Sequence, residues 1–160
     1  MWLVLTLPLA GAALNGLVAL ATAGDERARF KPLVTILGCG LPLISFAGAV
    51  ALFFTLIGFE AGSPAAITGP LFSWALSPSL VIDVGLSADQ LTLIMALVVS
   101  GVGSLIHIYS VGYMSHDAGY ARYFAEMNLF LFFMLVIVMA DNLVLMFAGW
   151  EGVGLCSYLL

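Results

Sequence analysis

The sequence predicts an all-α protein, a polytopic transmembrane helix bundle of about five spans forming a single domain over residues 1–160. Hydrophobic residues make up 63% of the chain and charged residues only 8%, whereas soluble domains carry about 25% charged residues. The apolar residues fall into five runs, most of them as long as the ~20 residues that a spanning helix needs. They do not alternate with polar residues as in a membrane β-barrel, so helices are expected.

The runs are joined by short polar connections, except for a longer one between the second and third runs. This expected outer loop, residues 60–86, contains no lysine or arginine. Its segment "GPLFSWALSPSLVIDVGLS" mixes aromatic and β-branched residues with glycine and proline, which favours a hairpin at the membrane interface. The expected helices are about 2–23, 33–59, 88–111, 122–140 and 143–160.

Capping signals mark the start of two of these helices. In "SADQ", Ser87 fits an N-cap and Gln90 completes a capping box, so the third helix is expected to begin there. Before the fifth helix, Asp141 and Asn142 have side chains of the type that caps helix N-termini. The first run ends in a cleavage-like "ATA", but it lacks the basic start of a signal peptide and is expected to remain as a helix.

The basic residues predict the orientation of the chain. They are Arg27, Arg29, Lys31 and Arg122. All four lie after the first or the third helix, and cytoplasmic loops carry an excess of lysine and arginine. Loops 24–32 and 112–121 are therefore expected in the cytoplasm, with the N-terminus outside. The net charge of −5 comes from thinly spread groups, and the chain has no basic patch. We therefore expect it to lie in a lipid bilayer and not to bind nucleic acid.

Glu151 is the main candidate for function, because it is a carboxylate inside an apolar run. With a helix starting near Asn142, nine residues at ~1.5 Å each place Glu151 about 13 Å into a hydrocarbon core ~30 Å thick. Such a group costs roughly 2.5–3.5 kcal/mol on insertion scales, and it usually marks a proton or ion path. The alternative is a neutral acid hydrogen-bonded to a neighbouring helix. The surrounding glycines, in "GWEGVG", allow either close helix approach or a local break in the backbone.

His107 is the second candidate, as a proton relay, and hydrogen-bonded packing is an equally good account of it. Counted from Asp89, it lies ~27 Å along the third helix, so direct pairing with Glu151 is not expected. No lysine or arginine lies at the depth of Glu151, which places its cationic partner beyond residue 160.

Redox and metal chemistry in this chain are not expected. Cys39 and Cys156 lie 117 positions apart, and they make neither a disulfide framework nor a zinc site. Iron–sulfur clusters need about four cysteines, and a membrane haem needs paired axial ligands. His116 lies in a loop, so His107 stands alone inside a membrane run. No glycine-rich phosphate cradle follows a strand.

Two segments resemble a known family. "LIHIYSVGYMSHDAGYARYF" (105–124) and "MADNLVLMFAGWEGVGLCSYLL" (139–160) closely resemble subunit L of NADH–quinone oxidoreductase, respiratory complex I, called subunit 5 in mitochondria. The resemblance runs from about Asp83 to the end and is weaker over the first two helices. The large subunit of multisubunit cation/proton antiporters shares the "GWE" pattern but is less similar through "LIHIYSVGYM". That subunit and a non-transporting membrane scaffold are the alternatives.

The resemblance implies a fourteen-helix, antiporter-like, proton-translocating subunit of the inner (plasma) membrane, made of three helices and two inverted five-helix repeats. This chain would then be an incomplete transmembrane domain, an N-terminal fragment holding the first five helices. It would act as part of an enzyme that couples NADH oxidation and quinone reduction to proton pumping. Its partners would be other membrane-arm subunits, and NADH, FMN, iron–sulfur clusters and quinone would be bound by other subunits.

The resemblance also implies roles for single residues. Glu151 matches the family's proton-transferring glutamate of helix five, whose lysine partner lies on helix seven. His107, Tyr109 and Tyr113 match positions on helix three, and the two tyrosines are expected to be interfacial anchors. Glu126 departs from the family, which commonly has an aromatic or apolar residue there. An i,i+4 ion pair with Arg122 would account for it, with Asp117 as a competitor for the same arginine.

Overall fold

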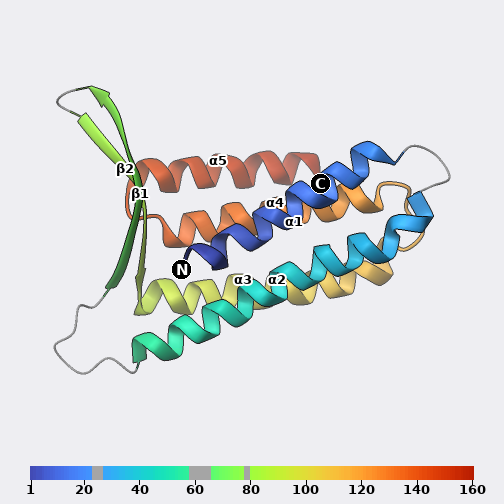
Figure 1. Cartoon of the computed structure of the whole chain (residues 1–160), viewed down its shortest axis with the longest axis horizontal. Helices are drawn as coiled ribbons and strands as arrows, with labels where there is room; N and C mark the ends of the chain where they lie inside the picture. The colour runs from blue at the N-terminus through green and yellow to red at the C-terminus, as the bar shows by residue number, and fades with distance from the viewer. Residues whose placement is uncertain (23–26, 58–65, 78–79) are drawn as a thin grey trace.

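The computed structural model describes residues 1–22, 27–57, 66–77 and 80–160, and these form a helix bundle with a β-hairpin across one end (Figure 1). The elements are α1 (Trp2–Ala21), α2 (Arg27–Ile57), β1 (Ala66–Ser77), β2 (Leu80–Asp89), α3 (Gln90–Tyr113), α4 (Tyr120–Met139) and α5 (Leu143–Leu159). In the described part of the chain, four helices are long and apolar enough to cross a membrane, and α5 is apolar but has 17 residues. The predicted fold class, a polytopic transmembrane helix bundle, is confirmed.

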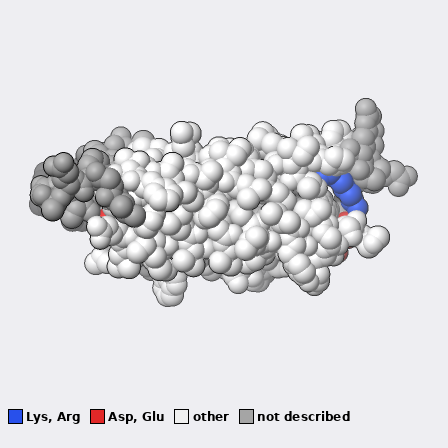
Figure 2. All heavy atoms as spheres, turned by 90° about the horizontal axis from the view of Figure 1, so that it is seen from below, with Lys and Arg blue, Asp and Glu red and all other residues white. Residues whose placement is uncertain are grey.

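The helices run back and forth between two ends of the molecule, as Figure 1 shows. The start of α1, the β-hairpin and the α4–α5 turn lie at one end, here called the hairpin end. The start of α2 and the α3–α4 turn lie at the other end, which we call the basic end because it holds Lys31 and Arg122. On the described part of the face in Figure 2, charged side chains gather at the two ends and leave the middle free. This distribution is the one expected of a bundle that crosses a bilayer.

α2 begins at Arg27, six residues before the predicted start at 33. The prediction followed the apolar run, which marks the part of a helix inside the membrane and not the point where the helix ends. Arginine and lysine are good helix formers, so the helix continues into the polar region. α4 begins at Tyr120, two residues before the predicted start at 122.

The cap of α3 differs from the prediction. The side chain of Asp89, and not that of Ser87, caps the helix by accepting a hydrogen bond from the backbone N–H of Thr92 at 2.7 Å. Ser87 pairs with Thr68 within the β-hairpin, which leaves it unable to cap. The hydrogen bonds from Thr92 hold the pKa of the Asp89 carboxyl below its usual value of 3.8.

The hairpin predicted within the outer loop is confirmed. β1 and β2 are antiparallel, from the pair Ala66↔Asp89 to the pair Ser77↔Leu80. Most of the expected loop 60–86 is therefore strand, while 58–65 and 78–79 lie outside the described residues. The hairpin is fixed to the bundle where the backbone N–H of Asp141 donates to the carbonyl of Gly85 at 3.3 Å.

The core of α1–α4 is divided along its length. Near the hairpin end it is apolar, with a cluster of Val4, Leu5, Ala49, Leu86, Ala96, Leu131, Leu135, Val136 and Met139. Near the basic end, Phe124 and Tyr120 pack with Val34. The buried polar side chains are Asn15, Thr22, Ser45, Ser100, Ser104, His107, Ser110 and Asn128.

Candidate functional site

The candidate site lies on α5, whose start is fixed by the turn before it. The side chain of Asn142 accepts a hydrogen bond from the backbone N–H of Leu145 at 2.9 Å, so the predicted N-cap is confirmed. The same amide donates to the carbonyl of Asp83 at 2.7 Å and to Asp141 Oδ1 at 2.6 Å. Asn142 therefore both starts α5 and ties it to β2.

Small residues bring α5 against α4. The buried residues of α5 are Gly149, Gly152 and Cys156, which form one stripe at helical spacing. A Cβ at Gly149 would lie 3.0 Å from the side chains of Val136 and Ile137, and a Cβ at Gly152 would overlap the ring of Phe133. The helix is continuous through these glycines, so close helix approach is the correct alternative and a backbone break is not.

Glu151 lies on the opposite face of α5. At ~100° per residue it points about 140° away from the buried stripe. Its side chain is exposed, as are those of Phe147, Leu155 and Tyr158 on the same face. Glu151 is eight residues from Leu143, about 12 Å along the helix, so it sits at mid-height on an apolar surface that no described element covers.

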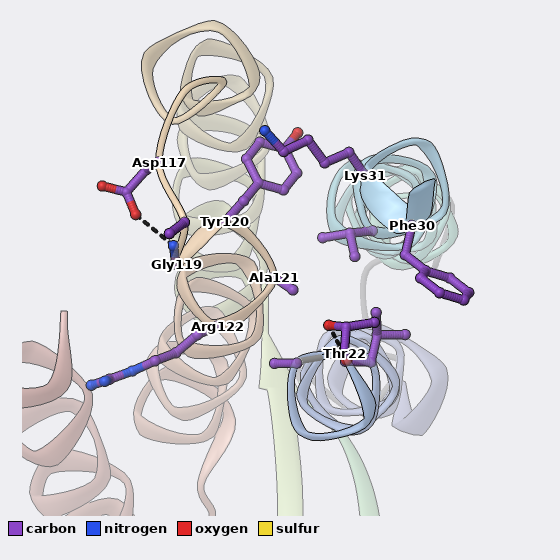
Figure 3. Close-up of a pocket in the computed structure, with 12 residues that line it drawn as sticks. Thr22, Phe30, Lys31, Asp117, Gly119, Tyr120, Ala121 and Arg122 are labelled. Carbon is purple, nitrogen blue, oxygen red and sulfur yellow. Dashed lines mark hydrogen bonds between the residues drawn. The ribbon is translucent and has the colours of Figure 1, made fainter. Parts of the chain in front are cut away.

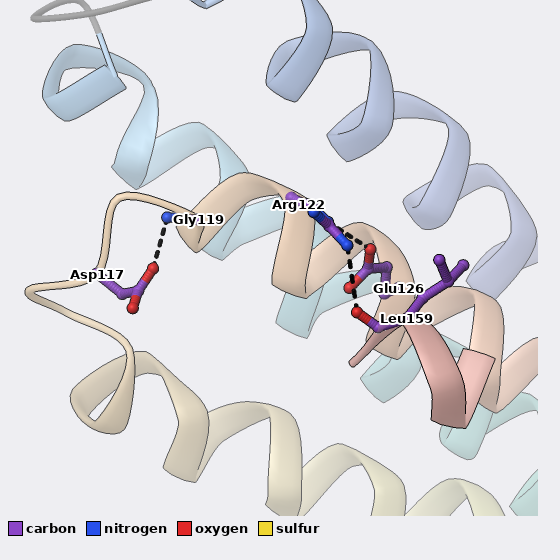
Figure 4. Close-up of polar contacts among 5 residues, drawn as sticks. All are labelled: Asp117, Gly119, Arg122, Glu126 and Leu159. Atoms are coloured by element: carbon purple, nitrogen blue, oxygen red, sulfur yellow. Dashed lines mark hydrogen bonds and ion pairs between the residues drawn. The ribbon is translucent and has the colours of Figure 1, made fainter.

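The described cations are engaged elsewhere, as Figure 4 shows for Arg122. Its Nε donates to Glu126 Oε1 at 2.7 Å, and its Nη2 donates to the carbonyl of Leu159 at 3.3 Å. The predicted Arg122–Glu126 pair is confirmed, whereas Asp117 does not compete for the arginine and accepts from the backbone N–H of Gly119 at 2.6 Å. Leu159 is about 12 Å beyond Glu151 on α5, too far for Arg122 to pair with the carboxylate.

Lys31 is held at the basic end of the bundle. Its Nζ donates to the carbonyl of Ser115 at 2.6 Å and lies 5.6 Å from the ring centre of Tyr120. It borders a pocket of about 300 Å³ between α1, α2 and the α3–α4 turn (Figure 3). Arg122 also borders this pocket but points away from it, and Glu151 does not line it. The pocket is therefore separate from the candidate site.

His107 is buried on the α4-facing side of α3. Its Nδ1 lies 2.7 Å from the carbonyl of Gly103, and its ring centre is 6.3 Å from that of Phe124. Because a carbonyl can only accept, Nδ1 carries the proton, which leaves Nε2 of the neutral ring as an acceptor. That atom is buried without a partner among the described residues. Glu151 faces away from α4, so the structure does not bring His107 and Glu151 together.

Tyr109 and Tyr113 lie on the outer surface of α3 near its end. Their rings are stacked with centres 6.0 Å apart, and the residues are 71% and 70% exposed. This placement is typical of the interfacial anchors that the sequence predicts.

Two polar residues of the core were missed by the sequence reasoning. Asn15 on α1 and Asn128 on α4 are both fully buried, and both have side-chain atoms without a partner among the described residues. The available signal was the same as for Glu151, a single polar side chain inside an apolar run. Amides are less costly than carboxylates in a membrane, and for that reason they stand out less.

The fold and the site together define a class: a multi-pass α-helical membrane protein with a carboxylate at the middle of one membrane helix. Residues 74–124 match the family model described as the N-terminus of chain 5 of NADH-ubiquinone oxidoreductase (complex I). NADH-quinone oxidoreductase subunit L of Mycobacterium tuberculosis is 46% identical over 99% of this chain. Subunit L of Escherichia coli is 47% identical over 73% of it. The chain belongs to the complex I chain 5 family, whose bacterial members carry the name subunit L.

The matching relatives are longer than this chain. The match covers 24% of the Mycobacterium tuberculosis protein and 19% of the Escherichia coli protein. Among solved structures, the Mrp complex from Dietzia sp. contains a chain that matches 99% of this one with a TM-score of 0.72 and 26% identity. Here too the match covers only part of the relative, 15% of that chain.

Proposed function

We propose that this chain belongs to a proton-translocating, antiporter-like subunit that couples NADH oxidation and quinone reduction to proton movement across the inner membrane. The observation that supports this is a lone carboxylate, Glu151, at mid-height of α5, in a chain 46% identical to a subunit L. NADH, FMN, iron–sulfur clusters and quinone are bound by other subunits in this proposal, and the partners of the chain are the other membrane-arm subunits.

Glu151 would exchange protons with a wet path on the uncovered face of α5. A cation brought close to Glu151 favours the charged carboxylate, and its withdrawal favours the neutral acid. Rearrangement driven by electron transfer elsewhere would alternate these two conditions and release the proton to the other side. Because neither Lys31 nor Arg122 reaches Glu151, the cation comes from a residue outside those that the structure describes.

The basic end would face the cytoplasm, with the hairpin and the N-terminus outside. Lys31 and Arg122 border the same pocket at that end, and α2 begins there at Arg27. Reporter fusions test this proposal. A fusion in the α3–α4 turn should be active only as a cytoplasmic reporter, and activity as a periplasmic reporter would reverse the orientation.

His107 is proposed as a secondary relay within the α1–α4 bundle, because its Nε2 is a buried acceptor without a partner among the described residues. His107→Gln keeps a hydrogen-bonding side chain and removes the titratable ring. A fall in proton flux at unchanged assembly would support the relay, and unchanged flux would leave His107 a packing residue.

The test of the main proposal is Glu151→Gln in the complete subunit, which keeps the shape and removes the titratable proton. Assembly should survive, and proton flux per NADH oxidised should fall substantially, with Glu151→Ala at least as severe and Glu151→Asp milder. The matched control is Glu126→Gln, a membrane-helix carboxylate that is paired with Arg122 and should leave flux nearly unchanged.

If Glu151→Gln kept the wild-type proton flux per NADH oxidised and the wild-type turnover, the carboxylate would be only a packing element. The antiporter alternative is supported by the structural match to the Mrp complex chain. It predicts cation-dependent proton exchange without any co-purifying NADH-dependent quinone reductase. The scaffold alternative predicts an inert position 151.

A further inference from the structure

Two asparagines lie at similar depth in the core, on helices that pack against each other. Asn15 is about 20 Å along α1 from the hairpin end, and Asn128 is about 17 Å along α4 from the same end. Both side chains are fully buried, with 0% exposure. They stand just past the apolar cluster that fills the hairpin half of the bundle.

The hydrogen bonds of Asn128 fix the orientation of its amide. Its Nδ2 donates to the carbonyl of Phe124 at 2.8 Å and to the carbonyl of Gly38 on α2 at 3.2 Å. Only the NH₂ group can donate to two carbonyls, so the remaining atom is the acceptor Oδ1, which has no partner among the described residues. Neither Nδ2 nor Oδ1 of Asn15 has one either.

Two glycines show where two of these atoms lie. A Cβ at Gly11 would lie 2.5 Å from Asn128 Oδ1, and a Cβ at Gly38 would lie 3.3 Å from Asn15 Nδ2. Gly11 and Asn15 are one turn apart on the same face of α1, about 5–6 Å between Cβ positions. Asn15 Nδ2 and Asn128 Oδ1 make no hydrogen bond to each other, and a water molecule that makes a hydrogen bond of ~2.8 Å to each would satisfy both.

We propose that Asn15 and Asn128 form a buried water-binding site between α1, α2 and α4. One water accepts from Asn15 Nδ2 and donates to Asn128 Oδ1, and a second donates to Asn15 Oδ1. A direct hydrogen bond between the two amides would leave Asn15 Oδ1 without a donor, so it would not satisfy all three atoms. A lipid environment supplies no water to buried polar groups, which makes such internal waters costly to remove.

An apolar cluster with Phe124, Tyr120 and Val34 lies on the basic-end side of the site, and Val18 packs against it. Val18, less than one turn from Asn15 on α1, lines the basic-end pocket, as does Thr22 one turn further. Toward the hairpin end the way is closed by apolar residues, among them Leu131 and Leu135. Water at this site would therefore be enclosed by apolar residues on both sides.

The direct test is a cryo-EM map of the protein in its native assembly in lipid nanodiscs, at a resolution that shows ordered waters. We expect density within hydrogen-bond distance of both Asn15 Nδ2 and Asn128 Oδ1, and none around Leu135. An Asn15–Asn128 bond without water density, or an empty gap, would overturn the proposal.

The Cβ of Gly11→Ala would overlap Asn128 Oδ1 and displace it, so the water density should disappear and thermal inactivation should become roughly tenfold faster. Gly16→Ala on the same helix is the control, because its Cβ would meet only Ala125, at 3.9 Å, and both properties should stay unchanged. If Gly11→Ala does not assemble, Asn15→Leu removes both orphan atoms at similar size and should lose the density as well. Density that persists in either variant contradicts the proposed ligands.

Discussion

Gly152→Ala should loosen the contact between α5 and α4 that supports Glu151. A Cβ at Gly152 overlaps the ring of Phe133, so the ring or the helix has to move. Overpacking of this kind costs typically 1–3 kcal/mol, which raises the population of a locally opened α5 by roughly 5- to 150-fold. Cys156 reports on this opening, because it is fully buried in the same stripe of α5.

The assay is the labelling rate of Cys156 by a small thiol reagent, in a background where Cys39 is replaced by alanine. Gly154→Ala is the control, since its Cβ has nothing within 4 Å and the change also favours the helix by about 1 kcal/mol. Gly152→Ala should label several-fold faster than the parent, and Gly154→Ala no faster. Equal rates in the two variants would refute the claim that close packing at Gly152 holds α5 against α4.

Other predictions concern the ends of the helices. Asp89→Ala should cost about 1 kcal/mol of thermal stability, whereas Asp89→Asn should cost little because both side chains cap well. Because the pKa of Asp89 is lowered in the folded protein, its stabilisation is complete above about pH 3.8 and is lost as the pH falls through the folded-state pKa. Asp89→Asn should remove this loss of stability at acid pH when melting temperatures are measured over a range of pH. Asn142→Ala should cost about 1–2 kcal/mol, more than Asp89→Ala, because it also breaks the bond to Asp83, and equal melting temperatures would contradict this. Arg122→Gln should leave the melting temperature nearly unchanged, since the arginine side chain in this i,i+4 pair with Glu126 is 65% exposed.

The sequence was sufficient for the helices because a bilayer imposes their length. Each apolar run of ~20 residues had one plausible structure, and five helices followed. The capping box predicted at Ser87 was wrong because the structure there is set by a distant segment of the chain. Its local pattern was satisfied, but Ser87 pairs with Thr68 in the hairpin, and no local pattern indicates a strand partner at that distance.

For the candidate site, the depth of Glu151 along its helix could be predicted from the sequence, but the face of the helix on which it lies could not. The position of Glu151 along α5 followed from counting residues at a fixed rise. The face on which it lies depends on Phe133 and Val136 of α4, which choose the glycine stripe as the contact surface. The proximity of the Asn15 and Asn128 amides could not be predicted either, because it depends on how α1, α2 and α4 pack.

The attachment of α5 is unequal at its two ends, and this has a mechanical consequence. At the hairpin end, Asn142 caps the helix and is bonded to β2, whereas at the other end the hydrogen bond from exposed Arg122 reaches the carbonyl of Leu159. Between these points the glycine stripe holds α5 against α4, so α5 would swing about its first turn only where that packing is released. Glu151 lies about 12 Å from the pivot and Leu159 about 24 Å, so any sideways swing moves the carboxylate half as far as the tip. A displacement of a few ångströms at Leu159 would thus shift Glu151 by about half that distance, enough to make or break a hydrogen bond.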